Sequence, residues 1–323
     1  MNEFNFKEML DIKIMRLSQS LWEHKVSREN LLRWLGNFQS SSKEAECEQT
    51  HAMYLLSNFM YFGAREIREL LKSLYRDKFF KPLIQKVRKK NSDTKDLLII
   101  ETEVKNELQA TRFLGMGNPS ESGTHLLYYF RQENGLGKED FMHSHEILSF
   151  DRDGSGNVSL RLNKPEVKRY ILLDDVCGSG TQAIEYSSKL VSEIKRLDSN
   201  VEVYYFTLFS TVEGMDNIRR RSDFNIVDCI FELDETFKCF SDNARQFRSE
   251  DHFPISKEFA KAFCEKYGNK LFGPQHCLGY KGSQLLLGFT HNTPDNTLPI
   301  IWGEDNWEPI FKRYHKKYGS KYN

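Results

Sequence analysis

The sequence predicts an α/β protein in which a parallel sheet lies between a helical N-terminal domain and a C-terminal extension. Residues 1–110 show apolar side chains at helical spacing, and from about residue 111 short apolar strands alternate with amphipathic helices. The 323 residues exceed the usual size of one domain. We therefore expect a helical domain at 1–110, an α/β core at 111–235 and an extension, or hood, at 236–323.

Composition and charge exclude several classes of protein. With 39% hydrophobic and 13% aromatic residues the chain can build a sizeable core, which excludes global disorder. Lys plus Arg and Asp plus Glu both number 46, and this zero net charge argues against a dedicated nucleic-acid binder. No run approaches the roughly 20 apolar residues of a membrane span. The N-terminus lacks the apolar segment of a signal peptide and the six cysteines form no CxxC pair, so we expect free thiols and a cytoplasmic protein.

Helices are predicted at 42–62, 64–75 and 95–108. The first two follow from apolar residues at helical spacing, with Gly63 as a stop between them. In the third, the run Leu97–Ile100 equally fits a strand, because periodicity alone does not separate a short buried strand from a helix.

The stretch Lys72–Lys90 carries eight basic residues against one acid. It is either a solvated helix face whose charge is balanced elsewhere, or a contact surface for an acidic protein or a nucleic acid. The zero net charge of the chain favours the first interpretation.

The segment from 111 to 233 is predicted to alternate between strands and helices, which is typical of a parallel sheet with helices packed on it. The predicted strands are 111–116, 170–173, 201–209 and 225–233; the helices are 124–132, 181–196 and 212–221; and a hairpin pairs 145–150 with 158–162.

The most informative segment is Tyr170–Thr181, with the sequence YILLDDVCGSGT. A buried strand ends in Asp174 and Asp175, and a loop of small residues then leads directly into a helix. In a parallel sheet, ligands bind at the carboxyl ends of the strands. Glycines and helix-terminal amides favour an anion, whereas two aspartates favour hydroxyl groups or a metal ion. The segment therefore predicts a site for a phosphorylated sugar, with these loop residues at the phosphate: Cys177, Gly178, Ser179, Gly180 and Thr181.

Other nucleotide-site motifs fit this segment less well. A Walker P-loop is excluded because no lysine follows the glycines. The Rossmann pattern GxGxxA is present, but the next predicted strand ends at Phe209 without the acid that binds a ribose. The segment also resembles the first motif of S-adenosylmethionine-dependent methyltransferases, although Val176 stands where a glycine is usual. A methyltransferase therefore remains an alternative.

The run Leu173–Thr181 more closely resembles the phosphoribosyl pyrophosphate (PRPP) loop of type I phosphoribosyltransferases. The resemblance implies that Asp174 and Asp175 hold the ribose hydroxyls of PRPP and that residues 178–181 cradle its 5′-phosphate. It also implies a pyrophosphate loop at 118–123, with Ser120, Ser122 and Gly123 at the ligand, and a Mg²⁺ ion at the two aspartates. Many members of the family carry an acid at the position of Gly178, so a magnesium-dependent transferase and a non-catalytic, ligand-responsive module both stay open.

Most of the chain resembles phosphoribosyltransferase-like proteins of bacterial anti-phage systems. The resemblance rests on His51–Phe62, Asn118–Gly123, the loop DDVCGSGTQ and the segment His291–Trp302. It implies a defence component that binds a sugar phosphate or nucleotide. The basic candidates for contact with pyrophosphate are Lys105, Arg112 and Arg131, and those for base or ligand contact are Tyr280, Lys281 and His291.

Overall fold

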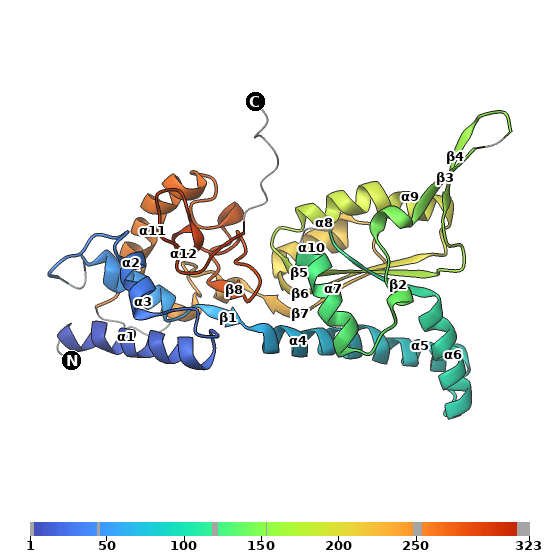
Figure 1. The fold of residues 1–323 in the computed structure, drawn as a ribbon, viewed down its shortest axis with the longest axis horizontal. Helices are drawn as coiled ribbons and strands as arrows, with labels where there is room; N and C mark the ends of the chain where they lie inside the picture. The colour runs from blue at the N-terminus through green and yellow to red at the C-terminus, as the bar shows by residue number, and fades with distance from the viewer. Residues whose placement is uncertain (1–2, 44–45, 118–121, 153, 248–253, 315–323) are drawn as a thin grey trace. The chain divides into compact units, whose positions relative to one another are not determined.

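The computed structural model describes residues 3–43, 46–117, 122–152, 154–247 and 254–314. Its contacts group the chain into two units, which are 1–67 together with 234–323, and 68–233 (Figure 1). This grouping differs from the three consecutive domains expected from the sequence. The physical reason is that the first helices share one core with the C-terminal part of the chain.

The first unit is mainly helical. Its helices are α1 (Glu3–Ser20), α2 (Arg28–Leu35), α3 (Glu48–Leu56), α11 (Lys257–Phe272) and α12 (Pro299–Trp302). Strand β1 (Met60–Phe62) pairs in parallel with β8 (Leu287–Phe289). The predicted helix 42–62 is therefore shorter than expected, and its last residues form a strand because β8 supplies their backbone partners.

Buried polar contacts join the two ends of the chain within this unit. Glu48 accepts hydrogen bonds from the Tyr267 hydroxyl at 2.6 Å and from Lys266 Nζ at 2.9 Å. His51 is fully buried, with Nδ1 2.9 Å from the Cys47 carbonyl oxygen and Nε2 accepting from the Ser256 amide at 3.1 Å. Because Nε2 is an acceptor, the imidazole is neutral with its proton on Nδ1. Burial lowers the pKa of His51 accordingly.

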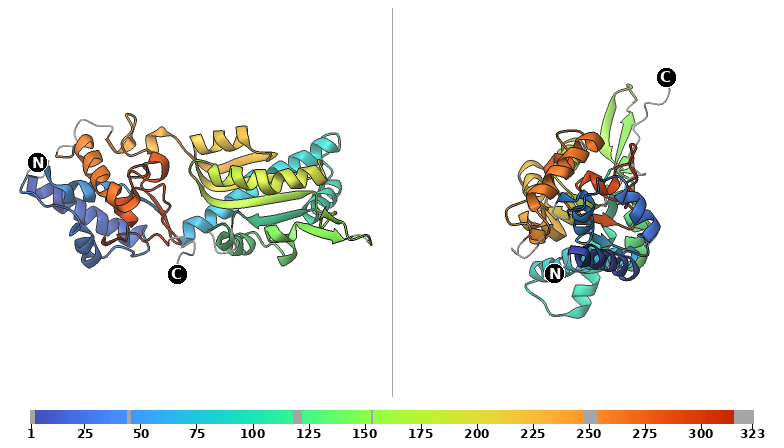
Figure 2. Two further views of the ribbon diagram at one scale, coloured as in Figure 1. Left: turned by 90° about the horizontal axis from the view of Figure 1, so that it is seen from above. Right: turned by 90° about the vertical axis from the view of Figure 1, so that its left-hand side faces the viewer.

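The second unit is the α/β core, and it confirms the predicted fold class. Strands β2 (Thr111–Gly115), β5 (Arg169–Cys177), β6 (Glu202–Thr211) and β7 (Ile226–Leu233) form one parallel sheet in that order. Both faces of β6 are buried, as expected for a central parallel strand. The predicted hairpin is present as β3 (Leu148–Arg152) and β4 (Val158–Leu162), and it extends away from the sheet (Figure 2).

Helices cover both faces of this sheet (Figure 1). On one face, α8 (Thr181–Tyr186), α9 (Ser192–Leu197) and α10 (Val212–Arg221) pack on β5 and β6, and a π-helical segment, Ser187–Val191, joins the first two. On the other face, aromatic side chains of α7 (Ser122–Glu133) and of a π-helical segment, Leu74–Phe80, contact β2. The remaining helices are α4 (Ala64–Ser73), α5 (Lys81–Lys90) and α6 (Leu97–Gln109).

Helix α6 resolves the ambiguity of the run Leu97–Ile100. The Asp96 side chain accepts a hydrogen bond from the Leu98 amide at 2.9 Å and so caps the start of the helix. The cap satisfies an amide that a strand would need to pair elsewhere.

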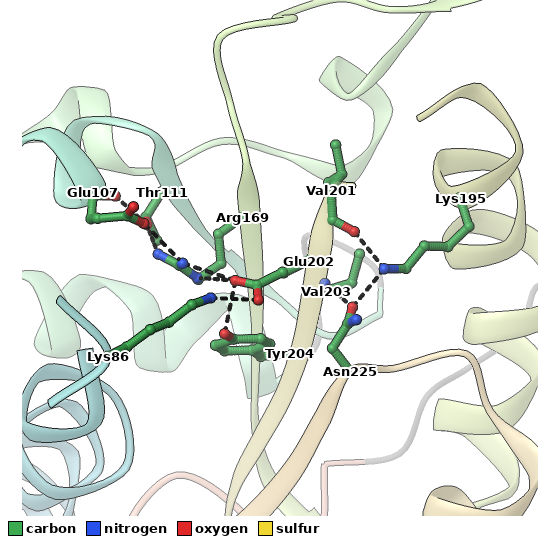
Figure 3. Close-up of polar contacts among 10 residues, drawn as sticks. All are labelled: Lys86, Glu107, Thr111, Arg169, Lys195, Val201, Glu202, Val203, Tyr204 and Asn225. Carbon is green, nitrogen blue, oxygen red and sulfur yellow. Dashed lines mark hydrogen bonds and ion pairs between the residues drawn. The ribbon is translucent and has the colours of Figure 1, made fainter. Parts of the chain in front are cut away.

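An ion network closes the amino-terminal edge of the sheet (Figure 3). The Arg169 side chain is 3% exposed and donates to Glu202 at 2.8 and 3.0 Å, to Glu107 at 3.0 Å and to the Thr111 hydroxyl at 3.1 Å. Lys86 donates to the second oxygen of Glu202 at 2.6 Å. The network thus ties the first residues of β2, β5 and β6 to helices α5 and α6.

Most of the basic stretch Lys72–Lys90 is paired with acids of the same unit. The ion pairs are Lys72 with Glu69 and Glu133, Arg76 and Lys81 with Asp77, Lys78 with Asp228, Lys86 with Glu202, and Lys90 with Glu103. Each helix of the described chain is too short or too polar to cross a bilayer.

Candidate functional site

The connections of the second unit single out the carboxyl ends of β2 and β5. A parallel bridge between Phe113 and Phe141 adds chain to the outer side of β2. After β2 the chain therefore passes first along this outer side and later crosses to β5 on the inner side. Such a reversal is a topological switch point, where open α/β sheets bind their ligands. The loops after β2 and β5 are the two loops that the sequence predicts as ligand contacts.

The predicted acid pair lies at the end of β5. The strand is longer than predicted, because Asp174 and the residues up to Cys177 still pair with β6. Asp174 Oδ2 accepts from the Tyr205 hydroxyl at 2.9 Å, and its Oδ1 accepts from the Asp175 amide at 2.9 Å. Asp175 is 5% exposed and its Oδ1 accepts from the Val176 amide at 2.8 Å.

The electrostatics of this pair differ from those of surface acids. Burial, followed by the neighbouring charge of Asp175, raises the pKa of Asp174 well above its ordinary value, while the hydrogen bond from Tyr205 acts in the opposite direction. Two carboxyl groups this close in a buried place favour sharing a proton or binding a cation.

The loop after the pair turns sharply into the helical run that starts at Thr181. Gly180 has φ +76°, a left-handed conformation that favours glycine. The hydroxyl oxygens of Ser179 and Thr181 are 2.9 Å apart, so both point to the same side of the turn. Cys177 is buried, and burial raises the pKa of its thiol to about 11, which makes it a neutral packing residue.

The second predicted loop begins beside the same strand. The Met116 amide donates to the Leu173 carbonyl at 2.8 Å, directly before the acid pair. Gly123 is buried against these groups, and a Cβ there would lie 2.7 Å from Met116 N and 2.8 Å from Leu173 O. Ser122 is the first residue of α7, whereas Ser120 and the rest of 118–121 lie outside the described residues.

The basic candidates are not brought to this edge. Arg112 stands at the start of β2, and its Nη1 donates to the carbonyls of Gln109 and Thr111 at 2.7 Å. Lys105 belongs to α6, which precedes β2, and Arg131 lies in the last turn of α7, which runs back from the carboxyl end of that strand. The expectation that these three residues contact a pyrophosphate is therefore wrong. Residues that are close in sequence can lie at opposite ends of a strand or helix, and the expectation took no account of this.

The three candidates for base or ligand contact, Tyr280, Lys281 and His291, belong to the first unit. The His276 and Tyr280 rings contact each other in a tilted arrangement with centroids 4.8 Å apart, and Lys281 has φ +53° in the same turn. His291 stacks with Phe289 at 5.4 Å. These contacts lie within the first unit.

Sequence reasoning missed three polar side chains around the loop. They are Tyr205 on β6, Thr211 at the end of β6 and Asn217 on α10. Nothing in the sequence of β6 singles out Tyr205, because Tyr204, Thr207 and Ser210 of the same strand are also polar and buried.

A family model described as PRTase-CE matches residues 31–313 of the chain, which include the second unit and most of the first. The chain belongs to the PRTase-CE family. It is therefore a phosphoribosyltransferase-like protein, as the resemblance implied. A comparison with curated protein sequences finds no match.

Solved structures similar to this PRTase-CE protein include three phosphoribosyltransferases. The xanthine-guanine-hypoxanthine enzyme of Helicobacter pylori has 10% identity and a TM-score of 0.23, over 42% of this chain and 88% of that chain. The orotate enzyme of Aeropyrum pernix has 14% identity and a TM-score of 0.24, over 51% and 76%. The adenine enzyme of Giardia lamblia complexed with 9-deazaadenine has 13% identity and a TM-score of 0.24, over 50% and 83%. The family assignment stands on the family model and not on these likenesses.

Proposed function

We propose that this PRTase-CE protein binds PRPP, or a closely related sugar phosphate or nucleotide, at the carboxyl ends of β2 and β5. The observation that carries the proposal is the adjacent acid pair and glycine loop at the topological switch point. Asp174 and Asp175 would face the ribose hydroxyls, and residues 178–181 would receive the 5′-phosphate. The loop that ends at Gly123 would meet the pyrophosphate.

The chemistry of the acid pair suits a Mg²⁺ ion. Magnesium prefers oxygen ligands and commonly uses one or two carboxylates together with water and ligand phosphates. Asp174 and Asp175 would be those carboxylates, and the ion would neutralise charge that builds up on a departing pyrophosphate. The chain itself would fix the sugar and exclude water from the anomeric carbon.

Whether the bound sugar reacts depends on the residues that face it. Gly178 offers no side chain where many type I phosphoribosyltransferases carry an acid. This observation favours a second candidate function, in which the pocket senses its ligand and reports to a partner without chemistry. Release of pyrophosphate from Mg²⁺·PRPP, measured with nucleobases and with cell extract, separates the two; release that depends on Asp175 would support the transferase.

Thermal and urea unfolding with added ligand test the binding proposal. At about 100 times the dissociation constant, Mg²⁺·PRPP should stabilise the native protein by roughly 2.7 kcal/mol. The double variant Asp174→Asn, Asp175→Asn should lose this stabilisation and remain folded, because an amide still accepts the hydrogen bond of Tyr205. Glu193→Gln, on the surface of α9, is the control and should respond like the parent protein.

If PRPP does not stabilise the parent protein, the binding proposal is contradicted. Stabilisation by S-adenosylmethionine in its place would favour the methyltransferase alternative.

We also propose a role in anti-phage defence, which rests on the resemblance of the sequence to such systems. Its test is the plating efficiency of a phage panel on cells with the gene and its neighbours. The parent gene should reduce plating, and the double aspartate variant should restore it. Equal plating with and without the gene across the panel would contradict this role.

A further inference from the structure

Helix α10 supports the glycine loop from behind. The Thr211 hydroxyl donates to the Gly178 carbonyl at 2.5 Å and accepts from the Gly214 amide at 2.9 Å. Asn217 Nδ2 donates to the Ser179 carbonyl at 3.2 Å. Two consecutive carbonyl groups of the loop are thus held by side chains from the N-cap and the second turn of α10.

The backbones of the loop and the helix also touch directly. A Cβ on Gly214 would lie 2.2 Å from the Gly178 carbonyl oxygen, and one on Gly180 would lie 2.9 Å from the Gly214 carbonyl oxygen. Neither distance leaves room for a side chain. The loop backbone therefore packs directly on the backbone of α10.

These contacts decide which way the loop amides point. A trans peptide group directs its C=O and its N–H to opposite sides. Because Thr211 holds the Gly178 carbonyl toward α10, the Ser179 amide in the same peptide group points away from the helix.

We propose that Thr211 and Asn217 are positioning residues for the phosphate group of the bound sugar phosphate. They act through the loop and touch neither sugar nor phosphate. The inference rests on the proposed function, since it specifies how the 5′-phosphate subsite is kept in shape.

The experiment compares two probes, each of which represents one part of PRPP: ribose 5-phosphate and Mg²⁺·pyrophosphate. Ribose 5-phosphate needs the glycine loop 178–181, whereas Mg²⁺·pyrophosphate needs the acid pair and the loop after β2. In Thr211→Val and Asn217→Leu, affinity for ribose 5-phosphate and for PRPP should fall about tenfold, the scale of one lost hydrogen bond in a preorganised site. Affinity for Mg²⁺·pyrophosphate should stay within twofold, as measured by isothermal titration calorimetry.

Two variants serve as controls. Thr211→Ser keeps the hydroxyl and should bind like the parent protein. Ser222→Ala removes a similar bond, from Ser222 Oγ to the Ile218 carbonyl at 2.7 Å, at the other end of α10, and should leave both affinities unchanged. Should Thr211→Val fail to fold, Asn217→Leu decides the question, since the Asn217 bond is only partly buried and caps no helix.

The outcomes separate this inference from the function on which it rests. A parent protein that binds no PRPP contradicts the proposed function, and the inference falls with it. A parent protein that binds PRPP, with variants that bind ribose 5-phosphate equally well, contradicts the positioning role alone. Equal weakening of both probes indicates general damage and also overturns it.

Discussion

Replacing Arg169 by Met should destabilise the second unit more than any exposed charge change. The variant loses four donated hydrogen bonds and leaves the partly buried Glu202 and Glu107 without their shared partner. Removing one member of a buried ion pair costs about 3–5 kcal/mol. Lys86 still pairs with Glu202, so we expect the lower end of this range, about 3 kcal/mol.

Urea unfolding, followed by far-ultraviolet circular dichroism, measures this cost. With a urea dependence of about 2–3 kcal/mol per molar for a unit of this size, the midpoint of its transition should fall by about 1 M or more. Arg161→Met is the matched control, because its side chain is 57% exposed and its partner Asp151 is 3.6 Å away and equally exposed. Such surface pairs contribute about 0–1 kcal/mol.

The pH dependence gives the same network a second test. Burial works against ionisation of Glu202, but the hydrogen bonds from Lys86 and Arg169 outweigh it and lower its pKa. The folded state therefore gains stability above the unfolded pKa of about 4.3 and loses it as pH falls through the lower folded pKa. Arg169→Met should flatten this acid-side loss. Equal midpoints for the Arg169 and Arg161 variants would refute the reasoning.

Three further predictions concern other buried groups. The lowered pKa of His51 means that the first unit should lose stability as pH falls below about 6.5, and melting curves at pH 7.5 and 5.5 should show a drop that is absent in His51→Phe. Glu48→Gln weakens the bonds from Lys266 and Tyr267 and should cost the first unit about 2 kcal/mol in urea, whereas a cost near zero would contradict the network. Gly180→Ala places a side chain at φ +76° and should cost at least about 1 kcal/mol and abolish PRPP-induced stabilisation, both read from melting curves with and without ligand.

Local patterns sufficed for the α/β core. Each strand of the sheet has an apolar run bounded by turn residues, and each helix between them has one apolar face. The acid pair predicts the end of a strand, yet Asp174 still pairs with Thr207 of β6. Polar residues at a strand end hide its true length, because the ladder continues wherever a neighbouring strand offers backbone partners.

Local sequence patterns do not predict contacts between parts of the chain that are distant in sequence. Met60–Phe62 reads as the end of a helix, and only its pairing with Leu287–Phe289 makes it a strand. Likewise, Thr211 and Asn217 contact the glycine loop only because β5 and α10 are neighbours in space. For the same reason Arg112 seemed close to the site in sequence, while the direction of β2 places it at the other edge.

The division of the chain into units sets the order in which it can fold during synthesis. The α/β unit is complete once residue 233 has left the ribosome, and independent units fold as they emerge. The first 67 residues must wait, because β1 has no strand partner and Trp34 has no acceptor until residues 287 and 300 have been made. A chain that stops before these residues would carry a folded α/β unit together with exposed apolar side chains of residues 1–67. Such exposed apolar segments are bound by chaperones and cut by proteases.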